Sequence, residues 1–372
     1  MPAAGRIAAW VAVAACVLTL IACAALAESP EERIARAAGF DALSRYAGDA
    51  DFDAWEALRT LLKGEGQSPS RVLAAWTDAL RVRLRVALIQ TLRALLPPVA
   101  LCAGLRLIFG KNAAGLGMAD LLCALCCAVT LAAQAAAARE TASAFLSALD
   151  GAASALTPVL VSALTLTGAP VTASILTPLA AECAALIDHV LGGLGLDLCA
   201  AACAVAVAGS LSRRFSLDRL FRLIAGGTRW LLGITVFLFG GLMSVRGLMG
   251  AASDTAAART AKLALENLVP IIGGELSGVS GSLAASAGMA RRALGFTGAL
   301  FIAHLCLEPM MKLAATLMSL RVAAALLEPL AGDAPVVVLI GRFADVQALV
   351  LALCACAALV TLLLAGGCAA LL

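Results

Sequence analysis

Charged side chains are scarce in this chain of 372 residues, where Asp, Glu, Lys and Arg together make up 14%. Soluble domains are about a quarter charged and about half apolar. Here 62% of the residues are hydrophobic, and the mean hydropathy is +0.98. The composition therefore excludes an ordinary soluble protein and predicts an all-α, polytopic integral membrane protein surrounded by lipid. The net charge of +3 gives no reason to expect nucleic acid as a partner.

Histidine is equally scarce, which limits the enzymatic chemistry that the chain can carry. The two histidines are His189, which follows Asp188 at an expected helix end, and His304. The sequence has no phosphate-binding Gly-rich loop, no His–Glu metal motif and no nucleophile beside a base. The chain is therefore predicted not to be an enzyme and to bind no cofactor.

Cysteine is abundant, with 13 residues, yet its placement does not indicate a metal site. Two cysteines lie near the N-terminus, and the other eleven lie on apolar segments between Cys102 and Cys368. Cys123, Cys126 and Cys127 lack the second Cys pair or His cluster that a four-ligand zinc site needs. Cysteine behaves as a small hydrophobic residue on such helices, so these cysteines are predicted to be structural.

The N-terminus is typical of a secretory signal peptide over residues 1–27. Arg6 precedes an apolar stretch, and Ala25-Leu26-Ala27 supplies a small-x-small cleavage site. Two alternatives remain open: a lipoprotein box that leaves Cys23 lipidated, and an uncleaved anchor helix. In each case residues 28–90 begin outside the cytoplasm. Apolar residues at helical spacing, among them Trp55 and Leu58, predict that this polar region is made of amphipathic helices.

Residues 91–372 are predicted to form a polytopic membrane domain with seven to ten crossings. Its apolar elements are expected near 91–109, 118–138, 152–167, 171–187, 190–209, 230–249, 263–285, 293–308, 311–330 and 346–366. Proline and glycine are expected to kink or break these helices, at Pro97, Pro98, Pro158, Pro178, Pro309 and Pro329 among other positions. The fold prediction is thus a helical bundle with Pro/Gly-broken helices.

A basic stretch at 210–229 is predicted to be a cytoplasmic loop by the positive-inside rule. It would join two halves, 91–209 and 230–368. Residues 156–180 align without gaps to 307–331, and both prolines of each copy match. If each half holds five elements, the halves are inverted relative to each other, an architecture common among transporters. Biased Ala/Leu composition is the alternative explanation of the match.

Charge inside apolar segments is a second lead, because such groups are costly in lipid and tend to face a bundle interior. Glu308 and Lys312 are four residues apart and are predicted to pair on one helical face. They could line a polar path or simply neutralise each other.

The segment 254–282 is the strongest candidate site. The segment contains the polar residues Asp254, Arg259, Lys262 and Asn267, which precede Pro270, Gly273 and Gly274. Stretches apolar enough to cross a bilayer flank the whole segment. A charged helix that Pro and Gly interrupt resembles the broken helices that turn backbone groups toward a cavity. We therefore predict that these residues line a pathway or dock a partner, against the alternative of an ordinary hairpin between spans.

The same run carries a family resemblance. Asp254-(x4)-Arg259-Thr260-Ala261-Lys262, followed by Asn267-Leu268-Val269-Pro270-Ile271-Ile272-Gly273, resembles the signature of the stage III sporulation protein AE family. The resemblance extends over the N-terminal signal, the polar region and the run of spans. It departs at Thr255, where family members usually have Gly, so a tight turn at that position is not expected.

The resemblance implies a membrane subunit of the channel that links mother cell and forespore in an endospore-forming bacterium and that late forespore development requires. The implied partners are the other stage III sporulation A-operon proteins and the forespore stage II sporulation protein Q. The implied location is the mother-cell membrane around the forespore. Two alternatives remain: a stand-alone secondary transporter for a small solute, which the repeat would favour, and a structural membrane scaffold without a pore.

Overall fold

The computed structural model describes most of the chain between residues 35 and 370. The described backbone covers 35–62 and 113–370, with gaps at 38, 49–52, 167, 212–216, 269–272 and 332–334, and single positions between 85 and 104. The predicted signal peptide, the lipoprotein box and the second amphipathic helix of the polar region lie outside these residues. The described part is almost entirely helical and contains no strand. This confirms the all-α prediction.

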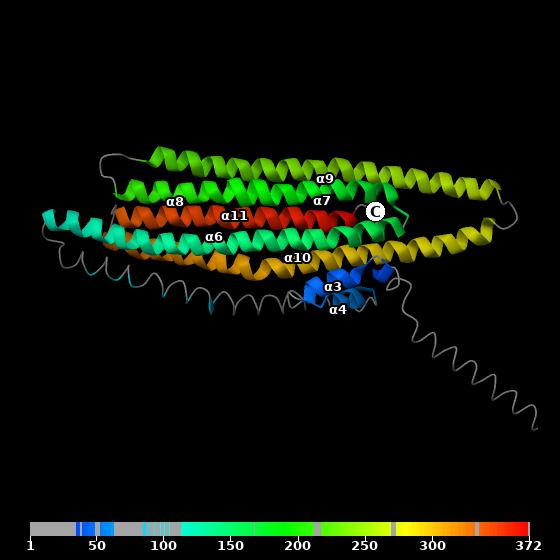
Figure 1. The fold of residues 1–372 in the computed structure, drawn as a ribbon, viewed down its shortest axis with the longest axis horizontal. Helices are drawn as coiled ribbons and strands as arrows, with labels where there is room; N and C mark the ends of the chain where they lie inside the picture. Colours follow the sequence, from blue (N-terminus) through cyan, green and yellow to red (C-terminus); the bar gives the residue numbers. More distant parts are fainter. Residues whose placement is uncertain are drawn as a thin grey trace, which may run out of the picture.

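Two short helices form a hairpin beside the main bundle. They are α3 (Phe40–Gly48) and α4 (Ala54–Leu62), and Asp53 caps the second by accepting a hydrogen bond from the Glu56 N–H at 3.0 Å. Phe40 and Leu58 are fully buried in the hairpin. The hairpin contacts α6 and α10 of the bundle, as Figure 1 shows in blue. The amphipathic helix that the spacing of Trp55 and Leu58 predicted is thus confirmed.

Trp55 holds this hairpin together. Its ring meets Phe40 edge to face at 4.9 Å between centroids, and its indole N–H donates to Asp41 Oδ1 at 3.2 Å. The guanidinium groups of Arg36 and Arg59 each lie 5.8 Å from the ring centroid. One indole therefore joins four side chains of this region.

We expect Trp55→Ala to unfold the hairpin locally while the bundle stays folded. An aromatic pair contributes about 1 kcal/mol and each exposed cation–π contact about 0.5–1 kcal/mol, so the loss is about 2–3 kcal/mol. Hydrogen–deuterium exchange of the full-length protein should show α3 and α4 losing protection. Trp55→Phe, which keeps a ring, should lose much less. Unchanged protection in Trp55→Ala would contradict this assignment.

The bundle consists of five long helical runs, drawn side by side in Figure 1. The first is α6 (Ala113–Leu166). The second joins α7 (Pro170–Ala185), the π-helix η1 (Leu186–Gly195) and α8 (Leu196–Leu211) without interruption. The others are α9 (Asp218–Leu268), α10 (Gly273–Ala331) and α11 (Pro335–Ala370). Leu and Ala favour helix and cover most faces, so these segments pack against each other and leave an apolar exterior.

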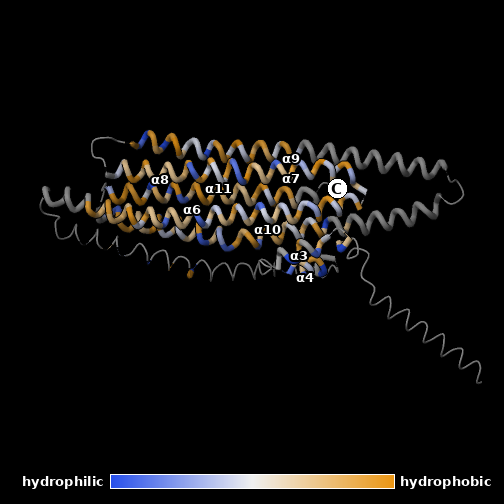
Figure 2. Tube along the Cα trace, viewed as in Figure 1, coloured by the Kyte–Doolittle hydropathy of each residue, from blue (hydrophilic) through white to orange (hydrophobic). Residues whose placement is uncertain are grey.

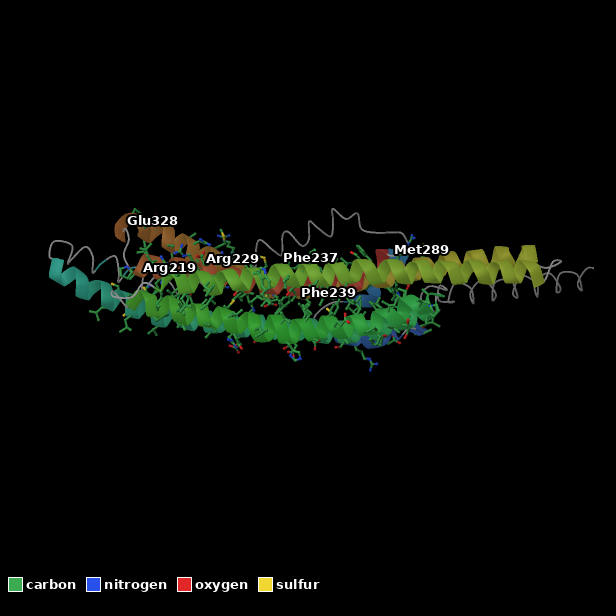
Figure 3. The ribbon with its side chains drawn as sticks, turned by 90° about the horizontal axis from the view of Figure 1, so that it is seen from above. Arg219, Arg229, Phe237, Phe239, Met289 and Glu328 are labelled. Carbon is green, nitrogen blue, oxygen red and sulfur yellow. The ribbon has the colours of Figure 1, made fainter. Side chains whose placement is uncertain are left out.

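Helix α11 is the centre of the bundle. It contacts α6, α7, α8, α9 and α10, and its most apolar stretch is the most deeply buried of the five. The largest fully buried side chains of the bundle include Phe239 on α9 and Phe301 on α10. Figure 2 shows apolar residues along most of the described bundle. Figure 3 shows the contrast on α9, where Phe237 is 77% exposed and Phe239, on the opposite face, is 1% exposed.

All five runs are long and apolar enough to cross a membrane within the described residues. The stretches are Leu122–Leu166, Pro170–Ser210, Asp218–Leu242, Arg292–Pro329 and Pro335–Ala365. This confirms a polytopic membrane protein. At 1.5 Å per residue, a helix of 54 residues is about 80 Å long, roughly twice the 40–45 Å of a whole bilayer. Parts of the long helices therefore lie outside the hydrocarbon.

The predicted segmentation into about ten elements is wrong for the described bundle. The segments expected at 118–138 and 152–167 are one helix, α6, and those at 293–308 and 311–330 are one helix, α10. Pro158, Pro178, Pro309 and Pro329 lie inside helices and interrupt none of them. Short polar interruptions such as 139–141 do not end a helix, because the flanking Ala and Leu residues continue the backbone hydrogen bonds.

The repeat receives no support from the local structure of its two copies. Residues 156–180 contain the turn between α6 and α7, where Gly168 has a φ of +81° and Ala169 N donates to Leu164 O at 2.9 Å. This left-handed glycine with a proline at the start of the next helix is a standard helix-ending turn. Residues 307–331, in contrast, form one uninterrupted stretch of α10.

Candidate functional site

The segment predicted as a pathway or docking site includes the end of α9 and the start of α10. Asp254, Arg259, Lys262 and Asn267 are all on α9, which ends at Leu268. Pro270 falls in the gap 269–272, and Gly273 and Gly274 begin α10. In Figure 1 this part of the two helices runs past the ends of the other helices. The side chains of residues 245–288 lie outside the description, so the role of this segment stays a prediction.

The predicted charge pair on α10 is present. Lys312 Nζ lies 2.8 Å from Glu308 Oε1, and the two side chains are 60% and 57% exposed. The pair lies on the outer surface of the bundle rather than in its interior. It neutralises two charges on one turn of α10, as the i,i+4 spacing predicts.

The structure brings together a different polar group, on α6 and the run η1–α8. Ser143, Ser147 and Asp150 of α6 face Asp188 and His189 of η1 across an open groove of about 600 Å³. Asp197 of α8 lines the same groove, which we call the polar groove. The Oδ1 atom of Asp150 is buried and has no hydrogen-bond partner among the described residues.

The wide backbone of the π-helix shapes this groove. The ten-residue helix η1 includes Gly192 and Gly193, which line the groove, and Gly195, which comes so close to α11 that an added Cβ would lie 2.6 Å from a Leu353 methyl carbon. π-Helical turns are rare and occur often at functional sites. The helix end expected at Asp188 and His189 is therefore wrong, since both lie within one continuous helical run.

An ion pair closes one end of the polar groove. Arg139 Nη2 of α6 lies 2.6 Å from Asp197 Oδ1, and Arg139 Nη1 donates to the Leu196 carbonyl oxygen at 3.3 Å. The side chains are 46% and 67% exposed, so solvent screening limits their contribution to stability to about 1 kcal/mol or less. The pair fixes the relative positions of α6 and α8 more than it stabilises them.

Beyond this ion pair lies a second, mainly apolar cavity of about 250 Å³, which we call the apolar cavity. Leu131 and Ala135 of α6, Cys199 and Cys203 of α8, and residues of α10 and α11 form its walls. Two amides lie among these apolar groups. Gln347 donates from Nε2 to the Leu313 carbonyl oxygen at 3.2 Å, whereas the buried Oε1 of Gln134 has no partner among the described residues.

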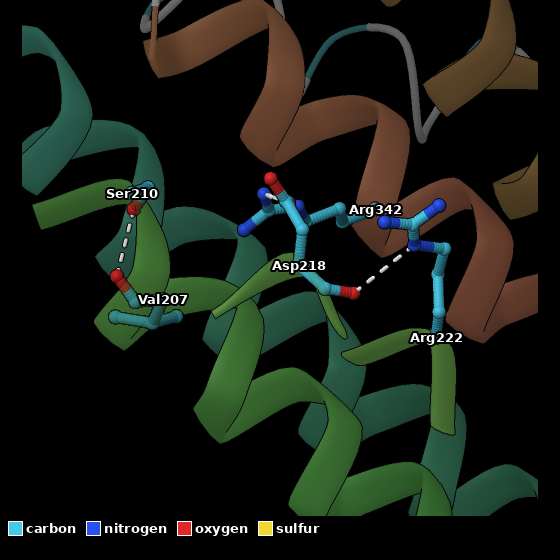
Figure 4. A network of polar contacts seen from close by, with 5 residues as sticks. All are labelled: Val207, Ser210, Asp218, Arg222 and Arg342. Carbon is cyan, nitrogen blue, oxygen red and sulfur yellow. Dashed lines mark hydrogen bonds and ion pairs between the residues drawn. The ribbon is translucent and has the colours of Figure 1, made fainter. Parts of the chain in front are cut away.

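A third polar cluster joins the start of α9 to α8 and α11, and Figure 4 shows it. Arg342 of α11 is 13% exposed, pairs with Asp218 and lies over the Phe221 ring at 5.7 Å. Gly209 of α8 leaves room for it, because an added Cβ would lie 2.7 Å from Arg342 Nη1. Arg222 Nε donates to the Asp218 carbonyl oxygen at 3.4 Å. Residues 218–229, predicted as part of a loop, thus form the first turns of α9.

Sequence reasoning missed the contacts between α6 and the run η1–α8. Arg139 and Asp197 are 58 positions apart, so no local spacing rule pairs them. The only signal was charge within apolar sequence, which the adjacent Arg139 and Glu140 supply. Within the described residues no group of His, Cys, Asp and Glu could hold a metal ion.

Comparisons with known proteins agree on one family. The family model for stage III sporulation protein AE matches residues 82–370, more than three quarters of the chain. The protein of Bacillus subtilis (strain 168) described as stage III sporulation protein AE is 21% identical over 178 residues. That alignment covers 48% of this chain and 45% of the relative, so the chain spans about half the length of the relative it matches. No solved structure matches.

Proposed function

Because the chain belongs to the stage III sporulation protein AE family, we propose that it is a membrane subunit of the channel joining mother cell and forespore during sporulation. The observation that carries the proposal is the family match over 82–370, which contains all five long helical runs. The chain is a multi-pass membrane protein of a sporulation family that is not known for enzymes.

The proposed channel role assigns the chain a non-catalytic task in late forespore development. The mother-cell membrane around the forespore is its proposed location. Its proposed partners are the other stage III sporulation A-operon proteins and the forespore stage II sporulation protein Q. Helices about twice as long as a bilayer is thick support this, because they extend beyond the lipid and offer surface to neighbouring proteins.

Of the alternatives, the stand-alone transporter receives no support from the described bundle. That hypothesis drew on the possible inverted repeat and on Glu308 and Lys312. The two aligned segments adopt different local structures, and the charge pair lies on the outer surface of the bundle. A scaffold without a pore would tolerate removal of charge at Arg259, Lys262 and Glu308 but would be sensitive to substitution at the Gly and Ser positions of helix contacts.

The direct test follows the protein in sporulating cells. A tagged copy at its own locus should encircle the engulfed forespore from the mother-cell side and co-purify with the proposed partners after mild detergent extraction. A tagged multi-pass protein of unrelated function, expressed at the same stage, is the control for non-specific capture. Uniform distribution over the cell membrane without enrichment of any proposed partner would refute the proposal.

A further inference from the structure

The apolar cavity and the polar groove lie end to end between α6 and the run η1–α8, and we call the two together the slot. On α6 the cavity is lined between Leu131 and Arg139, and the groove between Ser143 and Asp150. On the facing run, the neighbouring residues Leu196 and Asp197 line the cavity and the groove respectively. The Arg139–Asp197 pair marks the boundary. The slot is therefore apolar at one end and charged at the other, as an amphiphile requires.

The apolar end opens sideways between the two helices. Ala132 and Ala136 of α6 and Ala200 of α8 line the cavity and are exposed. These small side chains leave a gap at the bundle surface, and Phe343 and Val346 of α11 line the cavity from the centre of the bundle. Both helices belong to candidate membrane spans at this level. An acyl chain of a surrounding lipid can thus enter the apolar cavity without passing polar side chains.

The dimensions suit part of one acyl chain. From Leu131 to Arg139 the slot follows nine residues of α6, and the eight helical steps between them span about 12 Å. Half of a bilayer core is about 15 Å thick. The walls are apolar apart from Gln134, Arg139, Thr316 and Gln347, so most of a chain placed here would contact hydrocarbon groups.

The charged end selects the head group. Arg139 supplies guanidinium donors, which suit a phosphate, and its present partners leave further N–H groups unused. Past it lie Asp188 and Asp150, and the buried Asp150 Oδ1 accepts no hydrogen bond from the described residues. A head that places phosphate near Arg139 and a hydrogen-bonding ammonium near Asp150 would satisfy both ends.

We propose that this slot binds one membrane phospholipid with a primary-amine head, its acyl chain in the apolar cavity and its phosphate and ammonium groups in the polar groove. The juxtaposition of an apolar cavity, an arginine and an orphaned aspartate oxygen along two facing helices carries the assignment. Such a lipid would act as part of the bundle between α6 and α8.

The test uses the full-length protein in liposomes that contain a photoreactive phosphatidylethanolamine with a diazirine in its acyl chain. Ala200→Phe fills the mouth of the cavity. Ala201→Phe is the matched control, because Ala201 is the next residue, is also exposed and does not line the slot. Ala136→Phe and its neighbour Ala137→Phe repeat the comparison on α6, should one variant fail to fold. Phosphatidylglycerol with the same photoreactive chain tests the head group.

We expect labelling to concentrate on 131–139 and 196–203, to fall about tenfold in Ala200→Phe and Ala136→Phe, and to persist in both controls. Loss of a charge-assisted hydrogen bond corresponds to about tenfold in affinity, so Asp150→Asn should remove most of the preference for phosphatidylethanolamine over phosphatidylglycerol. Equal labelling of slot and control variants would mean annular lipid only and would overturn the site. Equal labelling by the two lipids in the unaltered protein would overturn the assigned head group.

Discussion

Replacing Arg259 and Lys262 together by alanine should stop sporulation after engulfment without lowering the amount of protein in the membrane. Both residues lie on α9 in the segment predicted to line a pathway or dock a partner. Losing one charge-assisted contact of about 2 kcal/mol at each position would weaken the proposed interaction about a thousandfold. The measurement is the yield of heat-resistant spores, combined with microscopy of the stage of arrest and a membrane immunoblot.

The matched control exchanges the two charges without removing them, as Arg259→Lys with Lys262→Arg. This variant keeps two cations one helical turn apart on α9 and should restore most of the spore yield if charge is what matters. Arrest by both variants would instead point to the shape of the guanidinium group. Normal sporulation in the double alanine variant would remove the segment from the functional site and favour the scaffold without a pore.

Phe301→Ala should be among the most destabilising single substitutions in the bundle. Phe301 is 0% exposed on α10. Removing a fully buried aromatic ring costs about 3–5 kcal/mol in soluble cores, mainly because the cavity does not collapse. The lower end, about 3 kcal/mol, is expected here, since side chains of separated membrane helices contact lipid rather than water.

Phe296→Ala is the matched control, because it removes the same ring from the same helix at a position that is 51% exposed. Its cost should stay below about 1 kcal/mol. Thermal unfolding of the purified proteins in one detergent should show a clear drop in Tm for Phe301→Ala and little change for Phe296→Ala. Equal shifts would contradict the placement of Phe301 in the core and of Phe296 outside it.

In the candidate site, spacing along the sequence predicts contacts within one helix but not contacts between helices. The Glu308–Lys312 pair was predictable, because two residues four apart on a helix are neighbours whatever surrounds them. The Arg139–Asp197 pair was not, since it depends on how α6 packs against α8. The same holds for Asp150, whose local sequence gives no sign that one oxygen is buried beside the π-helix.

The sequence by itself determined that this is an α-helical, multi-pass membrane protein and which family it belongs to. Composition and a short motif suffice for both, because lipid solvation acts on each residue separately and a motif is local. The tertiary structure alone decided that the apolar segments expected within the described bundle form five long runs, that α11 is central, and that a slot exists between α6 and η1–α8. These three features depend on contacts between residues far apart in the chain. Packing against neighbouring helices keeps the backbone helical at prolines and polar residues that would end an isolated helix.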